Sequence, residues 1–304
     1  MPWYAGNLHC HSTFSDGDTE AIKVAHWYRE HGYSFISLTD HNFLTPIDEY
    51  TLETPDFIGI PGSEYTCAVG KAQVHMNGIG IKERIPLPER GLSISETLQF
   101  GIDGIRSQGG MSIVNHPCRL WSYGSNEIKK LKGAQFFEVW NGAPTSNNIG
   151  DPQHESTDQI WDAMLSDGME IFGIAADDAH HYQDIDVSPK GNRDAPGTGW
   201  VWVHANELSC EAILTALENG DFIASNGVKL KSLERNCEKI AFEIDTLGKY
   251  ITHKTTFIGK EGKVLSEQDG LTVSYTPKGD ETYVRARIES SSGTRGWIQP
   301  VFLR

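Results

Sequence analysis

Two histidines near the start of the chain have the spacing of metal ligands. His9 and His11 are separated by one residue at the end of an expected strand, residues 4–10. Successive side chains of a strand point to opposite faces, so the two imidazoles point the same way. Neutral imidazole is the commonest side-chain ligand for metal ions in proteins. The H-x-H pair alone is weak evidence for a metal site, so further candidate ligands are needed elsewhere in the chain.

Further histidines and carboxylates follow the later expected strands. They occur in the segments Thr39-Asp40-His41-Asn42, Gly62-Ser63-Glu64, Asn115-His116-Pro117 and Ala176-Asp177-Asp178-Ala179-His180, with His75 inside a strand. The carboxyl ends of strands are where βα proteins place their active sites. A purely structural role would require each of these polar side chains to be satisfied separately in apolar surroundings. Their recurrence after strand upon strand therefore favours a metal site.

Taken in order, these motifs resemble those of the polymerase and histidinol phosphatase (PHP) family of metal-dependent hydrolases. Residues 9–17 are similar to the family's H-x-H…S-D-G, Thr39-Asp40-His41 to its T-D-H, Asn115-His116-Pro117 to its third motif and Asp178-Ala179-His180 to its terminal D-x-H. The resemblance covers about residues 7–225. Within the family, the chain looks most like members close to the carbaryl hydrolase branch, whose C-terminal β module ends in a segment similar to residues 293–300.

The resemblance implies a cofactor of two or three divalent metal ions, Mn, Fe or Zn. The implied ligand groups are His9, His11, Glu64 and Asp178 for the first ion; Glu64, His75 and His116 for the second; and Asp16, His41 and His180 for the third. Many family members carry histidine in place of Asp16. A carboxylate is the harder ligand, and it would favour Mn or Fe over Zn at the third site or leave that site weak.

The implied reaction is hydrolysis, in which a hydroxide that bridges two metals attacks the substrate. Glu64 and Asp178 would be catalytic as ligands of these metals. Asp40, beside His41, is expected either to orient a ligand imidazole or to cap the turn after its strand. Arg119, three residues after His116, is expected either to grip phosphate or carboxylate oxygens or to form a surface salt bridge.

Three classes of function compete for this site. The first is a phosphoesterase, a phosphatase or phosphodiesterase on a small molecule, which a basic pocket of Arg119, Lys190 and Arg193 would favour. The second is a carbamate or carboxylic ester hydrolase, which an aromatic pocket of Trp121, Tyr123 and Trp140 would favour. The third is a non-catalytic metal-binding module. A non-catalytic module is expected to have lost ligands, and no implied ligand is missing, so we rank that class last. We rank the phosphoesterase first because it is the commonest activity in the family that the chain resembles.

The elements that must position these residues alternate between strands and helices. Expected strands are residues 4–10, 35–39, 57–60, 73–79, 111–115, 136–140, 171–176 and 199–203. Expected helices run from a Thr19 cap to His31 and over residues 93–107, 155–166 and 209–218, each followed by glycine within two residues. Such alternation predicts a mainly parallel α/β sheet, and the resemblance implies a distorted (β/α)7 barrel. Residues 181–196 form a long polar loop, either a lid or a disordered segment.

The residue pattern changes near residue 228, from alternating strand and helix signals to strand and turn signals. Apolar and charged residues alternate over Tyr283–Glu289, and Pro277-Lys278-Gly279-Asp280 and Ser291-Ser292-Gly293 are turn signals. We therefore expect a hydrolase domain over residues 1–227 and a small antiparallel β module over residues 228–304.

The composition of the chain limits which partners it can bind and indicates where in the cell it is located. The 304 residues include 26 Lys and Arg against 41 Asp and Glu, a net charge of −15, which argues against non-specific nucleic-acid binding. Bound divalent cations reverse charge locally, so an anionic small-molecule substrate is compatible with it. No apolar run reaches 18 residues, the first residues lack signal-peptide features, and the five cysteines form no C-x-x-C pair. These features predict a cytoplasmic protein that does not bind membranes; they leave the oligomeric state open.

Overall fold

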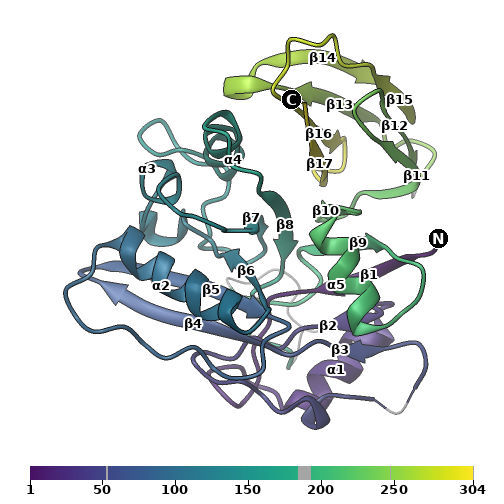
Figure 1. Cartoon of the computed structure of the whole chain (residues 1–304). Helices are drawn as coiled ribbons and strands as arrows, with labels where there is room; N and C mark the ends of the chain where they lie inside the picture. Colours follow the sequence, from purple (N-terminus) through teal and green to yellow (C-terminus); the bar gives the residue numbers. More distant parts are fainter. Residues whose placement is uncertain (53, 184–192, 247, 304) are drawn as a thin grey trace.

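The computed structural model describes residues 1–52, 54–183, 193–246 and 248–303. It has the mixed α/β architecture expected from the sequence, with the C-terminal strands gathered at one end of the molecule (Figure 1). The helices are α1 (Ala21–Glu30), α2 (Ile94–Ser107), α3 (Ser125–Ile128), α4 (Thr157–Ser166) and α5 (Cys210–Glu218), with short 3-10 turns at Ile47–Glu49, Arg119–Trp121 and Lys260–Gly262. None of the helices in these ranges combines the length and hydrophobicity needed to cross a bilayer.

A five-stranded sheet carries half of the candidate site. Its order is β4 (Gly62–Val69), β5 (Ala72–Ile79), β6 (Met111–Val114), β7 (Phe136–Asn141) and β8 (Phe172–Ala176). The β4–β5 hairpin is antiparallel, as is β5–β6, and β6, β7 and β8 are parallel. Strand β4 is absent from the sequence expectation because polar Ser63, Glu64 and Thr66 interrupt any apolar run there.

A nine-stranded sheet carries the other half. Its strands, in spatial order, are β14 (Val264–Asp269), β13 (His253–Ile258), β16 (Tyr283–Ser290), β17 (Arg295–Phe302), β10 (Phe222–Ser225), β9 (Trp200–His204), β1 (Trp3–Asn7), β2 (Phe35–Ile36) and β3 (Ile58–Gly59). Only β1, β2 and β3 run parallel, and β9 is antiparallel to β1, so the expectation of a mainly parallel sheet is wrong for this part. A third sheet joins β11 (Lys229–Arg235), β12 (Ile240–Asp245) and β15 (Thr272–Tyr275).

The closed barrel implied by the resemblance is not found in the described ranges, where the strands form three separate sheets. The two large sheets nevertheless meet beyond the carboxyl ends of β1, β2 and β8 and at the amino end of β4. Isolated bridges pair Cys10 with Ala179 and His41 with Glu64. Backbone hydrogen bonds from Asp178 N–H to the His9 carbonyl (2.9 Å) and from His11 N–H to the Ala179 carbonyl (2.9 Å) reinforce the first bridge. This junction brings the candidate ligands together.

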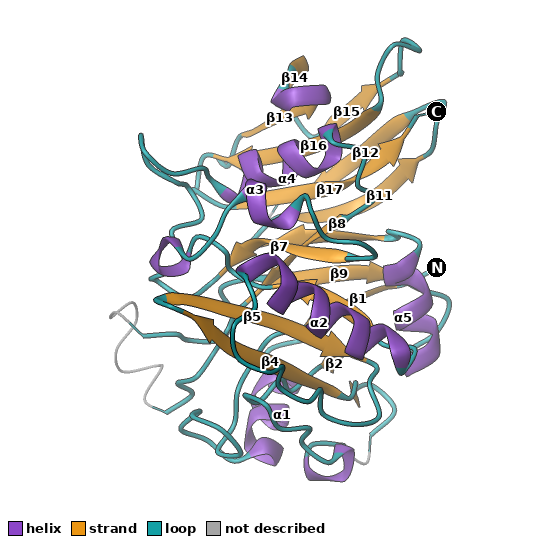
Figure 2. Ribbon diagram, turned by 60° about the vertical axis from the view of Figure 1, so that its left-hand side comes forward, coloured by secondary structure: helices purple, strands orange, loops and turns teal. Residues whose placement is uncertain are grey.

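The helices begin and end largely where the sequence predicts. Ser93 caps α2 in a reciprocal capping box with Glu96, and Ser156 caps α4 in the same way. Helix α2 lies along β4 and β5, with Leu98 and Ile102 buried against Tyr65 and Met76 (Figure 2). The expected Thr19 cap is wrong.

The Thr19 hydroxyl donates to Asp18 at 2.8 Å, and α1 starts after Glu20 without a side-chain cap.

The C-terminal strands are antiparallel, as expected, and they are tied to the preceding part of the chain. Strand β10 pairs with both β9 and β17, so one sheet runs through the expected boundary at residues 227 and 228. Fully buried Arg285 of β16 forms ion pairs with Asp162 (Nε–Oδ1, 2.7 Å) and Asp158 (Nη1–Oδ1, 2.9 Å) of α4. The two-domain division stays a prediction.

Candidate metal centre

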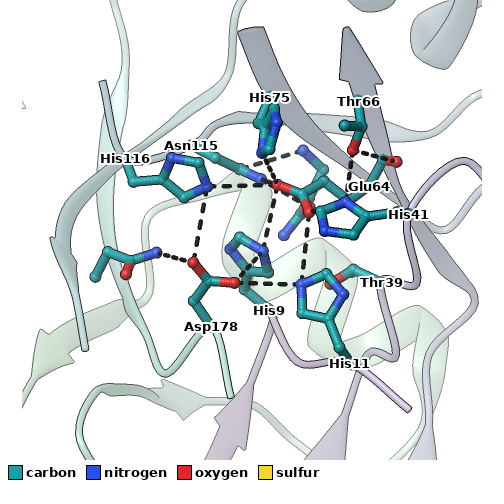
Figure 3. Close-up of polar contacts among 12 residues, drawn as sticks. His9, His11, Thr39, His41, Glu64, Thr66, His75, Asn115, His116 and Asp178 are labelled. Atoms are coloured by element: carbon teal, nitrogen blue, oxygen red, sulfur yellow. Dashed lines mark hydrogen bonds and ion pairs between the residues drawn. The ribbon is translucent and has the colours of Figure 1, made fainter. Parts of the chain in front are cut away.

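Nine side chains predicted as ligands lie together where the two large sheets meet. His9 and His11 follow β1, His41 follows β2, Glu64 and His75 lie on the β4–β5 hairpin, His116 follows β6, and Asp178 and His180 follow β8, with Asp16 in the loop after His11. Most of them converge on one point (Figure 3). Three overlapping subsets bring ligand atoms within 4.8 Å of one another: His11, Asp16, His41 and His180; His9, His11 and Glu64; and His41, Glu64 and His75.

The Glu64 carboxylate is at the centre of this cluster. It is fully buried, and both of its oxygens face imidazole nitrogens (Figure 3). The distances from Oε1 are 3.1 Å to His75 Nδ1, 3.4 Å to His9 Nε2 and 3.5 Å to His116 Nε2, and those from Oε2 are 2.8 Å to His41 Nδ1 and 3.5 Å to His11 Nε2. Asn115 also donates to Oε1 at 2.8 Å. A carboxylate placed in this way contacts ligands of every predicted ion.

Asp178 closes the cluster from the β8 side. Its Oδ1 lies 3.1 Å from His9 Nε2 and 3.2 Å from His11 Nε2. The residue has φ +54°, in the left-handed region that non-glycine residues rarely adopt. Backbone strain of this kind is characteristic of functional sites.

The third predicted group is the most open. Asp16 lies 3.4 Å from His180 Nε2, 3.5 Å from His41 Nε2 and 3.7 Å from His11 Nδ1. Its side chain is 57% exposed, whereas Glu64 and Asp178 are buried. A ligand held in part by solvent-exposed Asp16 would exchange more readily than one held by the buried groups.

The donor atoms of the cluster fit divalent metal ions. His9 Nε2, His11 Nε2, His75 Nδ1 and Glu64 Oε2 are buried and make no hydrogen bond within the described residues. Buried polar atoms without partners are costly, and convergence of several on one point is explained by a cation that they share. Imidazole nitrogen together with carboxylate oxygen is a donor set suited to Zn, Fe and Mn.

A buried glutamate that the sequence analysis overlooked orients two of the histidines. Glu138 of β7 accepts a hydrogen bond at 2.6 Å from His9 Nδ1, and also from the backbone N–H of His116 at 2.8 Å and from Asn141 Nδ2 at 3.0 Å. Because a carboxylate only accepts, Nδ1 of His9 carries a proton, which leaves Nε2 as the nitrogen that would bind a metal ion. The signal for this residue was a charged side chain inside the apolar run Phe136–Trp140.

The electrostatics of the cluster favour bound cations. Burial alone would lower the pKa of His9, but the carboxylates of Asp178, Glu138 and Glu64 raise it above its ordinary value. Burial alone would raise the pKa of Glu64, but the surrounding His75, His9 and His41 hold it well below the usual range. The carboxylates therefore stay ionised and draw positive charge to this point, which protons or metal ions can supply.

Asp40 supports a loop and contacts no imidazole among the described residues. Its Oδ1 accepts from the Ser12 N–H at 2.8 Å and the Ser15 hydroxyl at 2.7 Å, and its Oδ2 accepts from the hydroxyls of Ser12 (2.9 Å) and Thr45 (2.5 Å). Three of these four bonds go to the loop after β1, and only the Thr45 bond lies in the segment that follows its own strand. Asp40 thereby fixes the loop that presents Asp16.

Arg119 points into the centre and not to the surface. Its Nη1 donates to Asp178 Oδ2 at 2.8 Å, and its Nη2 lies 3.9 Å from Asp194 Oδ2. The next two residues, Leu120 and Trp121, have φ +52° and +53°, so a strained turn holds the arginine in place. The other members of the expected basic pocket do not add to it: Arg193 is exposed, and Lys190 lies outside the described residues, as does most of the expected loop.

The expected aromatic pocket is not assembled. Trp121 stacks on His154 with ring centroids 4.1 Å apart, and Trp140 packs against Trp297 at 5.8 Å. Tyr123 is buried, and its hydroxyl donates to the Asn115 carbonyl at 2.9 Å. The three rings therefore pack against different parts of the protein and do not line one pocket.

Comparison with solved structures identifies the fold. The chain is similar to a two-domain protein containing a predicted PHP-like metal-dependent phosphoesterase from Bacteroides vulgatus ATCC 8482, with a TM-score of 0.53 and 16% identity over 98% of this chain and 95% of that one. The chain has a PHP-like fold. The resemblance to the PHP family is thus confirmed at the level of the fold, and nothing bears on the carbaryl hydrolase branch.

Two further solved structures are similar to parts of this PHP-like chain. One is a putative metal-dependent phosphoesterase from Bifidobacterium adolescentis ATCC 15703 (TM-score 0.45, 14% identity, 61% of this chain and 90% of that one). The other is an amidohydrolase from Chromobacterium violaceum with bound sulfate and no metal (TM-score 0.41, 16% identity, 59% and 88%). No protein-family model and no curated protein sequence matches the chain.

Proposed function

We propose that this protein is a metal-dependent phosphoesterase of the PHP family that hydrolyses a small phosphate ester. The observation that carries the proposal is the convergence of three buried imidazole nitrogens, of His9, His11 and His75, on the carboxylate of Glu64, with no hydrogen bond to any of the three among the described residues. The PHP-like fold supports it, because that fold is shared with a protein described as a predicted metal-dependent phosphoesterase.

The proposed ligand groups are those that the sequence suggested. Two or three divalent ions, Mn, Fe or Zn, would be held by His9, His11, Glu64 and Asp178; by Glu64, His75 and His116; and by Asp16, His41 and His180. Such ions, when bound, would lower the pKa of water and stabilise negative charge on the reacting oxygens.

The chain's own residues would bind and orient the substrate. Arg119 Nη1, 2.8 Å from Asp178, is placed to pair with an anionic phosphoryl oxygen at the mouth of the cluster. Glu138 fixes the direction of the His9 ring, and Asn115 Nδ2 holds Glu64 Oε1. These hydrogen bonds reduce the reorganisation that ligand binding would otherwise require.

A hydrolysis screen of the metal-loaded protein tests the proposal. Protein reconstituted separately with Mn, Fe and Zn is assayed on phosphomonoesters, phosphodiesters and uncharged aryl carboxylic esters and carbamates. We expect turnover of a phosphate ester that is lost on chelation and in Glu64→Gln. Turnover of only the carboxylic esters or carbamates would support the second class of function, and stoichiometric metal binding without any turnover would support the third.

A further inference from the structure

A groove beside the metal centre has the size of a ligand site. Its volume is about 750 Å³, and it lies between the β4–β5 hairpin, the segment of residues 87–92 and the start of α2. Pockets that bind small organic ligands typically enclose roughly 300–1,000 Å³. Nothing in the proposed chemistry of the metal centre uses this space.

The groove borders the metal centre through two neighbouring residues. Thr66 of β4 and His75 of β5 are directly opposite in the hairpin, and both line the groove. His75 Nδ1 lies 3.1 Å from Glu64 Oε1, and Thr66 Oγ1 lies 2.6 Å from His41 Nδ1. Figure 3 shows both side chains at the same edge of the cluster. A molecule in the groove would therefore lie against residues of the cluster itself.

The hairpin supplies a track leading away from the cluster. Side chains two residues apart on a strand share a face, so Glu64, Thr66 and Ala68 are on one side of β4. Ala68 is opposite Gln73, and both line the groove. At about 3.3 Å per residue, Ala68 is roughly 13 Å along the strand from Glu64. This length suits an organic group attached to a reacting ester.

The lining favours an uncharged, apolar occupant. Leu87 and Leu92 border the groove, and Leu87 is half exposed without filling it. The charged lining residues Glu89 and Arg90 are adjacent, exposed and opposite in sign, so they provide no net charge. One polar feature is available in addition, because Gln73 Oε1 is buried without a hydrogen-bond partner among the described residues. A donor on the occupant would satisfy it.

An extended peptide is a poorer fit, although β4 is the edge strand of its sheet. A peptide would need the backbone groups of β4 that point away from β5. At Glu64 the N–H donates to the Asp40 carbonyl and the carbonyl accepts from Asn42 N–H. At Thr66 the N–H and carbonyl are bound by the Asn42 side chain at 3.0 Å each. The edge is therefore already satisfied next to the cluster.

We propose that this groove binds the leaving group of the substrate, an uncharged organic group of aryl size, while the phosphoryl group lies at the metal centre. The inference rests on the proposed function. In the reaction, a bond forms between phosphorus and the oxygen of water, and the bond between phosphorus and the ester oxygen breaks. The ester oxygen departs with a proton from that water, so the products are inorganic phosphate and an alcohol or phenol.

The test compares two phosphate esters that differ in the leaving group. Ala68→Trp fills the groove from an exposed position, and Leu87→Asp places a charge in it. We expect either change to raise KM for 2-naphthyl phosphate about tenfold or more, with KM for ethyl phosphate changed less than about twofold, since burying a ring of this size is worth at least a factor of ten. The controls are Ala241→Trp, at a half-buried alanine of β12 in the third sheet, and Val264→Asp, at a residue with exposure similar to that of Leu87.

A binding measurement separates this inference from the proposed function. 2-Naphthol is titrated into the metal-loaded protein and followed by its fluorescence, which needs no turnover. We expect saturable binding that is weakened by Ala68→Trp and Leu87→Asp and unchanged in both controls. The inference would be overturned if 2-naphthol binding or KM for 2-naphthyl phosphate were the same in both groove variants as in the parent protein. A complete lack of 2-naphthol binding would also overturn it. Absence of hydrolysis together with groove-dependent binding would instead refute the proposed phosphoesterase.

Discussion

Glu138→Gln is the sharpest test of how the cluster is built, because Glu138 touches two predicted ligands without belonging to the predicted set. The carboxylate accepts three hydrogen bonds, from His9 Nδ1, the His116 N–H and Asn141 Nδ2. Glutamine keeps the shape but replaces one acceptor oxygen by an N–H₂ group. Whichever way the amide turns, at least one N–H donor then faces another donor.

The size of the effect follows from these contacts. The 2.6 Å contact with His9 is a short, charge-assisted hydrogen bond, and bonds to charged groups contribute roughly 1.5–3 kcal/mol. Without the carboxylate, the Nδ1 proton of His9 can also move to Nε2, and in that tautomer Nε2 has no lone pair for a metal ion. Partners of this kind typically change metal affinity by about 10–100-fold when they are mutated. We expect a loss in that range with the fold retained.

The assay is competition with a chelating dye for Zn or Mn, paired with thermal unfolding of the chelator-treated protein. Asp162→Asn is the matched control, since it converts another buried acid, bound to Arg285, to its amide away from the cluster. The control should lower the unfolding temperature and leave metal affinity unchanged. Metal affinity of Glu138→Gln within about twofold of the parent protein would refute the assigned orientation of His9.

The remaining predictions address occupancy, catalysis, substrate charge and stability. Elemental analysis of protein purified without chelators should give at least two divalent ions per chain, and less than one equivalent, with none regained on adding Mn or Zn, would contradict the ligand set. Glu64→Gln should abolish turnover with an unchanged circular dichroism spectrum, because Glu64 belongs to two of the proposed ligand groups, and retention of more than a tenth of kcat, a loss under about 1.4 kcal/mol, would exclude that shared role. Arg119→Ala should raise KM for a phosphate ester about ten- to a hundredfold, a charge-assisted contact of roughly 1.5–3 kcal/mol, and leave KM for a neutral aryl ester almost unchanged; equal effects on both would exclude an anion-binding role. Burial alone would raise the pKa of Asp158, but the guanidinium of Arg285 lowers it, so this pairing stabilises the protein above about pH 4 and fades as pH falls further. Arg285→Met should therefore cost about 3–5 kcal/mol in urea unfolding at pH 7 and progressively less below pH 4, and a cost independent of pH would show that the ion pairs do not cause it.

The sequence predicted those parts of the fold that local pattern determines. Apolar runs bounded by glycine became β5, β6, β7 and β8 within one or two residues of the expected ends. Glycines shortly after their ends marked α2 and α4, and the structure adds a serine capping box at the start of each. Strand β4 escaped because its alternate side chains, Glu64 and Thr66, face polar groups of the cluster and not an apolar core. The polar side chains that β4 contributes to the cluster replace the apolar residues by which a strand is recognised in a sequence.

For the candidate site, the sequence indicated ligand types but not the residues that orient them. The predicted set lies together because most of its members follow strands that end at one junction, where the β4–β5 hairpin supplies Glu64 and His75. Glu138 could not be assigned, since its role depends on His9, 129 positions earlier. The hydroxyl partners of Asp40 likewise come from Ser12 and Ser15, and only the folded loop brings them into reach. Long-range pairing of this kind leaves no periodic signal.

The pairing of β10 with β17 cannot form until about 70 residues after β10 have been synthesised. Ser225 and Arg295, which meet there, are 70 positions apart. A ribosome adding roughly 5–20 residues per second needs about 4–14 s to supply the second partner after the first. During that interval the edge of β10 is unpaired, and such an edge is a template for pairing with other chains. A nascent chain that carries all nine predicted ligands therefore still exposes an unpaired strand edge, to which another chain can bind.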